Sequence, residues 1–278
     1  MPKKRQTLLF SATMTKNLES MQDLAMTKPF FWQQKSEEST VEELEQYYIL
    51  IPADVKDAYL VHTLDKYLEN NKKSSVIIFT NTCKYTQILG IILSELGMQC
   101  VVLHSMIRQK ERLASLAKFK SSQVKIMIAT DVASRGLDIP TVDLIINHNV
   151  PNRPKDYVHR VGRTARAGRC GKSITLVTQF DVKLVHSIED FIKKKMDEWP
   201  VEEKEVMKIL VEVATSKREA EIRLDEKDFG EQKDINKRKR MILQGKDPEQ
   251  EEKKKQKIIK EKIKERKKNR DKKKMEAV

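Results

Sequence analysis

The feature that most constrains the fold is an alternation between short, fully apolar segments and longer segments that are apolar on one side only. Residues 76–80, VIIFT, are rich in β-branched side chains, which is typical of a strand buried on both faces of a sheet. Residues 84–96 carry apolar side chains every three or four positions, the spacing of an amphipathic helix, and Gly97 provides a stop signal. These two segments predict one strand followed by one helix.

The same alternation continues through most of the chain. Because strands that alternate with helices of this length form parallel sheets, the sequence predicts an α/β domain over residues 41–200, with helices on both faces of the sheet. Ligands are expected where loops leave the carboxyl ends of the strands. Further strands are predicted at residues 47–51, 100–104, 125–130, 143–148 and 173–178, and further helices at residues 55–68, 109–120, 154–166 and 181–195.

The end of the chain has a different composition. Residues 201–230 show one apolar stripe and predict a helix, within a helical extension that we assign to residues 201–248. Residues 249–278 carry 12 Lys and 2 Arg against 6 Glu and 1 Asp, which leaves +7 of the total net charge of +14. We predict a disordered basic tail there, and a polyanionic partner for the chain.

The composition disfavours two classes of protein: those that span a membrane and those built on disulfides or bound metal. No run of about 18 apolar residues occurs, so the sequence predicts a soluble, intracellular protein that does not span a membrane. The three cysteines, Cys83, Cys100 and Cys170, are widely spaced and lack any C-x-x-C pair. We expect reduced structural thiols and no protein-bound metal.

A concentrated positive charge marks residues 159–168, HRVGRTARAG. On the helix predicted for residues 154–166, His159, Arg163 and Arg166 would lie on one face. Guanidinium groups on one face repel each other unless an anion or carboxylates lie opposite, so this row suits a phosphate. The alternative is a surface helix whose arginines pair with acidic residues elsewhere in the fold.

A second polar segment, ATDVASRGLDIP at residues 129–140, begins at the end of a predicted strand. Hydroxyls of Thr130 and Ser134 can bind phosphate or sugar oxygens, Gly136 permits close backbone approach, and Asp138 suits a ribose hydroxyl. The alternative is that Asp131 and Asp138 cap the loop beside the arginines.

Together these segments resemble the second, RecA-like lobe of the DEAD-box ATP-dependent RNA helicases. The resemblance covers roughly residues 5–199, and residues 1–40 resemble the end of the first lobe and the inter-lobe linker. The matching motifs occur in the order of the family: SAT at residues 11–13, IIFTNT at 77–82, HSMIRQKER at 104–112, ATDVASRGLDIP at 129–140 and HRVGRTARAG at 159–168.

The resemblance implies a role for each motif. Arg163 and Arg166 would be arginine fingers that stabilise the γ-phosphate of ATP in the transition state, with His159 in the catalytic network. Gly136 and Asp138 would contact the ATP sugar. Inter-lobe coupling would join His159 to Ser11, Ala12 and Thr13, and the RNA-binding residues would be Thr80, Asn81, Thr82, Gln109, Arg112 and Thr130.

Those RNA-facing groups are hydroxyls, amides and one guanidinium, which hold phosphates and 2′-hydroxyls without reading bases. The resemblance therefore implies RNA binding that is largely independent of sequence. One departure from the family pattern is Ser105, which follows His104 where glycine is usual, and it puts the local backbone in doubt.

The larger departure is that no G-x-x-x-x-G-K-[ST] phosphate loop, no Asp-Glu-Ala-Asp stretch and no glutamine-containing adenine motif occurs in the 278 residues. In the family these belong to the first lobe, which also provides most of the binding site for the Mg²⁺ that accompanies ATP. We therefore expect this chain by itself to have negligible ATPase activity. The sequence opens a few residues before SAT, which favours a piece of a longer protein.

The leading hypothesis is the C-terminal half of an ATP-dependent RNA helicase that unwinds short RNA duplexes or remodels RNA–protein complexes. The extension and tail resemble those of nucleolar members, which implies rRNA processing, ribosome biogenesis, contacts with pre-ribosomal proteins and a nuclear, nucleolar location. A monomer is expected. The alternative is a non-catalytic RNA-binding or adaptor module, and the tail is either an RNA tether or a solubilising or nuclear-import segment.

Overall fold

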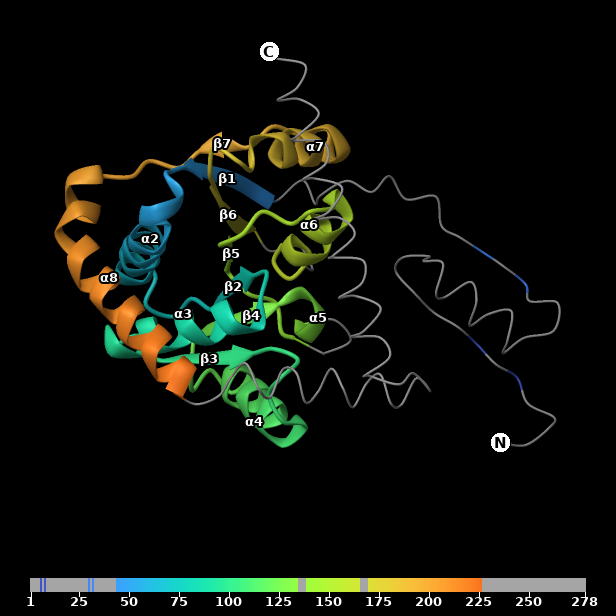
Figure 1. Ribbon diagram of the computed structural model, residues 1–278. Helices are drawn as coiled ribbons and strands as arrows, with labels where there is room; N and C mark the ends of the chain where they lie inside the picture. Colours follow the sequence, from blue (N-terminus) through green and yellow to red (C-terminus); the bar gives the residue numbers. More distant parts are fainter. Residues whose placement is uncertain are drawn as a thin grey trace, which may run out of the picture. The chain divides into compact units, whose positions relative to one another are not determined.

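The computed structural model describes residues 44–134, 139–165 and 170–226, together with Gln6, Leu8, Phe30 and Trp32. The chain divides into two compact units, Met1–Glu38 and Ser39–Val278, and the second holds the described fold. Its centre is a seven-stranded sheet with the order β3-β4-β2-β5-β6-β1-β7 (Figure 1). The strands are β1 (Leu44–Leu50), β2 (Val76–Thr80), β3 (Cys100–Leu103), β4 (Ile126–Thr130), β5 (Leu144–Asn147), β6 (Gly171–Val177) and β7 (Asp197–Glu198).

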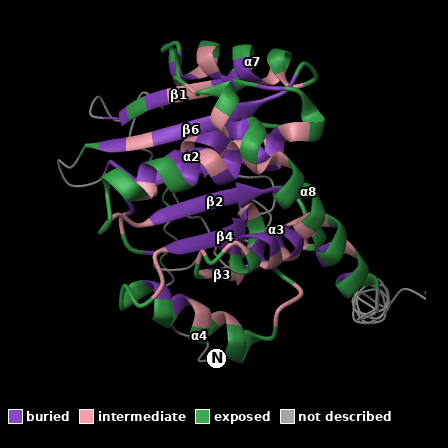
Figure 2. Cartoon of the chain, turned by 90° about the vertical axis from the view of Figure 1, so that its left-hand side faces the viewer, coloured by how far each residue is buried: buried purple, intermediate pink, exposed green. Residues whose placement is uncertain are grey.

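Every neighbouring pair in this sheet is parallel, as the alternation of segments predicts. In the central strand, Ile78 is aligned with Ile128 of β4 and with Ile146 of β5. All five residues of β2 are buried, since helices cover both faces (Figure 2). The RecA-like α/β fold predicted from the sequence is thereby confirmed.

The helices divide between the two faces. Cores shared with the sheet place α2, α3 and α8 on one face and α4, α6 and α7 on the other. The period of two along β2 explains this division, since Val76 and Ile78 join the first core while Ile77 and Phe79 join the α4 core. The bounds are η1 (Ala53–Val55), α2 (Lys56–Asn70), α3 (Cys83–Glu95), α4 (Gln109–Lys120), α5 (Asp131–Ser134), α6 (Pro154–Val161), α7 (Val182–Ile192) and α8 (Glu203–Glu226).

The long helix α8 crosses the face made by α2 and α3 (Figures 1 and 2). Its side chains Val206, Val213, Ala220 and Leu224 are buried in the same core as Leu60 and Ile78. Their spacing of seven, seven and four residues keeps them on one side of the helix. Residues 201–230 were predicted to be helical with a single apolar stripe, and α8 has this character up to Glu226. None of the described helices is long and apolar enough to cross a membrane.

Most predicted boundaries lie within three residues of the observed ones, and Gly97 follows α3 with a φ of +79°, as its role of helix stop requires. The helix predicted for residues 154–166 is the exception, since α6 ends at Val161. The amides of Arg163 and Thr164 each reach back only three residues, and Ala165 has a φ of +50°. His159 and Arg163 therefore do not lie on one helix, so the prediction of a helix through residues 162–165 is wrong, and Arg166 lies outside the described residues.

The helical period fails there because the chain turns inward. Thr164 is fully buried, and its hydroxyl donates to the carbonyl oxygen of Val142 at 2.5 Å. A short helix α5 and a two-residue strand β7 were not predicted, since neither is long enough to show a period.

Candidate functional site

Four polar segments converge on one edge of the sheet. Thr80 ends β2, Thr130 ends β4 and Asn147 ends β5, while His104 follows directly after β3. Because all four strands are parallel, their carboxyl ends share this edge, where α/β sheets bind ligands. The topology of the sheet thus brings together parts of three predicted motifs, IIFTNT, HSMIRQKER and ATDVASRGLDIP.

A buried arginine that the sequence analysis did not select ties these segments together. Arg160 is 1% exposed, and its Nε and Nη2 atoms donate to the two carboxylate oxygens of Asp131 at 2.6 and 2.7 Å. Its Nη1 donates to the Asn149 carbonyl oxygen at 2.7 Å and to Asn147 Oδ1 at 3.2 Å. The guanidinium also lies over the Phe79 ring, 5.2 Å from its centroid.

This bidentate pair satisfies a charge that would otherwise be costly to bury. The alternative considered for the arginine-rich segment, pairing with an acid elsewhere, holds for Arg160, and Asp131 does lie beside an arginine. A usable signal in the sequence was the position of Arg160 next to the apolar Val161, on the inward side of a helix that begins with proline.

The segment after α6, residues 162–165, is fixed by its backbone. The amide of Val142 donates to the carbonyl oxygen of Arg163 at 3.0 Å, which complements the bond from the Thr164 hydroxyl to Val142. Gly171 lies against the same place, because a Cβ there would come within 2.3 Å of the Thr164 hydroxyl. These contacts lie at the amino ends of β5 and β6, and the side chains of Arg163 and His159 are both half-buried.

The residues predicted to face RNA fall into two groups. Asn81, Thr82 and Gln109 are exposed, and the Thr82 hydroxyl caps α3 by accepting from the Tyr85 amide at 3.2 Å. Thr80 is fully buried, with its hydroxyl 2.7 Å from that of Thr86. This side chain can support the loop but does not offer its hydroxyl to a ligand directly.

Of the other two residues predicted to face RNA, Thr130 is buried and Arg112 is half-buried. Thr130 is 6% exposed, and among the described residues its hydroxyl has no hydrogen-bond partner. On the first turn of α4, Arg112 Nη1 donates to Gln109 Oε1 at 3.1 Å, so these two predicted residues lie side by side.

His104 is buried and must be neutral to keep its bonds. Its Nδ1 accepts from the Met106 amide at 3.3 Å, and its Nε2 lies 3.1 Å from Gln87 Oε1. A neutral ring with the proton on Nε2 satisfies both contacts. Burial lowers the pKa of His104 to about 4. The ring therefore does not supply positive charge to the edge near neutral pH.

Part of the predicted site lies outside the described residues. This holds for Gly136, Asp138 and Arg166, which were assigned to ATP, and for Ser11, Ala12 and Thr13, which were assigned to inter-lobe coupling. Of the predicted ATP-binding residues, Arg163 is the one that lies within the described ranges, and its carbonyl oxygen accepts from the amide of Val142, two residues before β5 begins. The described ranges contain no group of three or more His, Cys, Asp or Glu side chains arranged for a metal ion.

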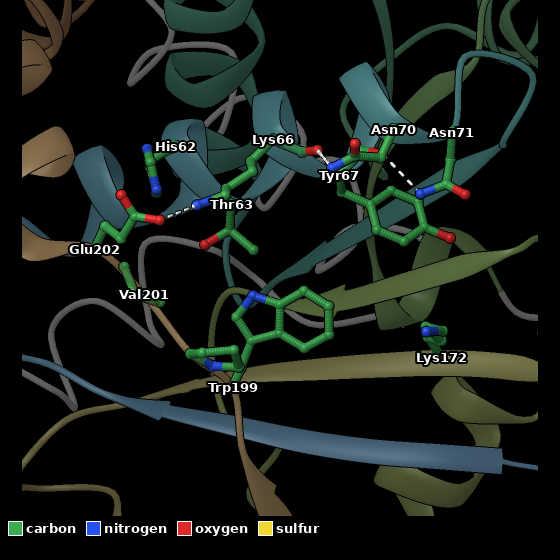
Figure 3. Close-up of a pocket in the computed structure, with 11 residues that line it drawn as sticks. His62, Thr63, Lys66, Tyr67, Asn70, Asn71, Lys172, Trp199, Val201 and Glu202 are labelled. Carbon is green, nitrogen blue, oxygen red and sulfur yellow. Dashed lines mark hydrogen bonds and ion pairs between the residues drawn. The ribbon is translucent and has the colours of Figure 1, made fainter.

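A hollow of about 350 Å³ lies elsewhere, between α2 and the chain that leads from β7 into α8 (Figure 3). The Trp199 indole lies beneath α2 and meets the Tyr47 ring edge-on, with centroids 4.9 Å apart. Lys66 pairs with Glu202 across it at 2.7 Å. None of the predicted site residues lines this hollow, which lies where the chain that leads into α8 packs on the rest of the lobe.

Comparisons with known proteins identify relatives of this chain among the RNA helicases. The sequence model described as "Helicase conserved C-terminal domain" matches residues 59–168. The probable ATP-dependent RNA helicase DDX49 of Homo sapiens is 58% identical over 265 residues, which cover 95% of this chain and 55% of that protein. The probable ATP-dependent RNA helicase Dbp45A of Drosophila melanogaster is 45% identical, with 95% of this chain and 51% of that protein covered.

Among solved structures, Dbp5 of S. cerevisiae bound to RNA and ADP BeF3 matches with a TM-score of 0.63 and 27% identity, over 77% of this chain and 56% of that one. The chain thus spans about half the length of the curated relatives that it matches. The matched helicase domain, the parallel RecA-like sheet and the motifs gathered at its carboxyl edge lead to one conclusion. The chain belongs to the DEAD-box RNA helicases, of which it carries the C-terminal lobe.

Proposed function

We propose that this chain is the second lobe of an ATP-dependent RNA helicase that unwinds short RNA duplexes or remodels RNA–protein complexes. The observation that carries the proposal is the buried ion pair between Arg160 and Asp131. It joins α6, the helix that leads directly to Arg163, to the strand ends that carry the RNA-facing motifs. The identity to proteins named as probable ATP-dependent RNA helicases supports it.

In this proposal the arginines act on ATP held mainly by the first lobe. Arg163 and Arg166 bind the γ-phosphate and stabilise the charge that develops in the transition state, which in phosphoryl-transfer enzymes is worth about 10³–10⁵ in rate. Gly136 and Asp138 bind the sugar of ATP. ATP with Mg²⁺ supplies the free energy for closing the two lobes on RNA, while His159 couples closure to the Ser-Ala-Thr segment.

The RNA side of the proposal rests on exposed polar groups. Asn81, Thr82 and Gln109 present amides and a hydroxyl at the edge, with Arg112 beside Gln109. Such groups hold phosphates and 2′-hydroxyls, so binding is largely independent of base sequence. Thr80 and Thr130 shape the strand ends behind them.

An unwinding assay tests the proposal. The chain is joined behind the first lobe of a DEAD-box relative, and release of one strand from a short RNA duplex is measured with ATP. We expect unwinding by the two-lobe protein and none by the chain alone, because the chain has no phosphate loop. RNA-stimulated phosphate release by the chain alone would contradict the requirement for a first lobe. A two-lobe protein that binds RNA and ATP without unwinding would favour an adaptor.

We further propose a setting in rRNA processing and ribosome biogenesis in the nucleolus, as a monomer that meets pre-ribosomal proteins. The basic tail of residues 249–278 is the supporting feature. Imaging of the tagged protein, with and without residues 249–278, checks the location. Accumulation of pre-rRNA after depletion checks the process, and unchanged pre-rRNA would contradict it.

A further inference from the structure

The extension helix α8 reaches the functional edge through a chain of polar contacts. It lies outside residues 59–168, the part matched by the helicase domain. Its Lys217 Nζ donates to Asp57 Oδ2 of α2 at 2.8 Å. Lys217 is about one-third exposed, whereas the Asp57 side chain is 5% exposed, so the contact runs from the surface into the interior.

Asp57 is a buried carboxylate with partners from three other parts of the fold. Its Oδ1 lies 2.9 Å from His148 Nε2 and also accepts from the Tyr85 hydroxyl of α3. The Lys217 ammonium lies 5.6 Å from the centroid of the Tyr85 ring. Burial opposes ionisation of Asp57, but the hydrogen bonds from His148, Lys217 and Tyr85 outweigh it and hold the pKa of Asp57 well below its usual range.

His148 belongs to a segment that is held from both faces of the sheet. Neighbouring residues at a strand end point to opposite faces. Accordingly, His148 meets Asp57 beneath α8, whereas Asn147 Oδ1 and the Asn149 carbonyl oxygen accept from Arg160 on the other side. Asn149 Oδ1 also accepts from the Asn81 amide at 3.2 Å, so the same segment holds the loop after β2.

Arg160 in turn constrains residues 162–165, the segment after α6 that carries Arg163. It lies in the last turn of α6, three residues before Arg163, whose amide donates to the Arg160 carbonyl oxygen at 3.0 Å. Every link from Lys217 to Arg163 is therefore a direct contact or a short stretch of backbone.

We propose that Lys217 and Asp57 are positioning residues: through His148 they hold residues 147–149 against Arg160, and so fix the place of Arg163 for its work on ATP. This inference rests on the proposed function. In this inference α8 belongs to the folded lobe and, through Lys217, helps to position Arg163.

Two readouts with matched variants test it. Lys217→Met removes the ammonium and retains most of the aliphatic stem, Lys217→Arg restores a donor, and Lys208→Met removes an exposed lysine that pairs with Glu205 of the same helix. The first readout uses the 278-residue chain and follows the NMR cross-peak of the Arg160 Nε–H group, which reports its bond to Asp131. We expect the cross-peak to shift in Lys217→Met, to return in Lys217→Arg and to stay in place in Lys208→Met.

The second readout is the RNA-stimulated ATPase of the two-lobe protein. We expect kcat to fall about tenfold in Lys217→Met with KM for ATP unchanged, at a temperature where every variant is folded, since misplacing a catalytic group can cost up to about 10² in rate. A cross-peak and a kcat that both match those of Lys208→Met would overturn the inference. If the unsubstituted two-lobe protein has no such ATPase, the proposed function fails, and the cross-peak alone decides whether α8 positions Arg160.

Discussion

At the scale of single residues, Arg160 shows how one side chain organises the site. A lysine could keep the charge, but it has no planar fork to bind both oxygens of Asp131 while also reaching Asn147 and Asn149. We predict that Arg160→Lys lowers the free energy of unfolding by about 3 kcal/mol, the usual cost of breaking a buried pair. Urea denaturation measures it, and Arg153→Lys at an exposed pair serves as control. Equal effects of the two changes would contradict the buried-hub interpretation.

His104 gives the lobe an acid sensitivity of its own. The pKa of His104 is about 4 in the folded lobe and near 6.5 in the unfolded chain, so its contribution is complete above about 6.5 and is lost as the pH falls towards 4. Between pH 7 and pH 5 we expect the natural chain to lose about 2 kcal/mol more unfolding free energy than His104→Gln, which cannot take up a proton. Denaturation at the two pH values measures this difference. Parallel losses in both proteins would show that His104 does not carry the effect.

At the scale of elements, the contact between β6 and residues 162–165, which carry Arg163, can be tested with two glycines. A Cβ at Gly171 would meet Thr164 Oγ1 at 2.3 Å and the Ala165 amide at 2.5 Å, whereas Gly97 has open space but a φ of +79°. Gly171→Ala and Gly97→Ala should each lower the unfolding free energy by on the order of 1–3 kcal/mol. In the two-lobe protein only Gly171→Ala should also reduce the ATPase, by about tenfold, because it displaces Arg163. Loss of activity in both variants would mean that instability alone is responsible.

The sequence predicts elements well where a period is sustained over several turns. The strand at residues 76–80 and the helix that ends before Gly97 are examples, since each has an unbroken pattern and a clear stop. The helix predicted for residues 154–166 failed because Gly162 and Thr164 carry no local signal that the chain turns inward towards Val142. A contact between residues 22 positions apart in sequence is invisible to a local pattern.

The same reasoning separates the candidate residues that a sequence pattern can indicate from those that it cannot. Motif order indicated Arg163 and the strand-end threonines as candidates, because each occupies a recognisable segment. Asp57 and Lys217 were missed because they lie 160 residues apart, and only the packing of α8 on α2 brings them together. Their chemistry is evident only once their burial is known.

At the scale of the whole molecule, the basic tail should add affinity for RNA without adding sequence preference. Each phosphate that it neutralises contributes about −0.7 to the slope of log K against log salt on single-stranded RNA. Removing residues 251–278 should therefore weaken binding at low salt and flatten that slope, as fluorescence anisotropy would show. A full-length chain with the tail lysines changed to glutamine should behave like the shortened one. An unchanged slope would leave the tail as a solubilising or localisation segment.

We propose that this lobe delivers Arg163 to ATP bound by the first lobe. The most direct measurement is the single-turnover rate of ATP hydrolysis by the RNA-bound two-lobe protein, for the natural sequence, Arg163→Ala and the control Arg153→Ala. We predict that Arg163→Ala slows hydrolysis by about 10³-fold or more, with ATP still bound and the control unaffected. A hydrolysis rate in Arg163→Ala close to that of the control would show that Arg163 does not act on ATP.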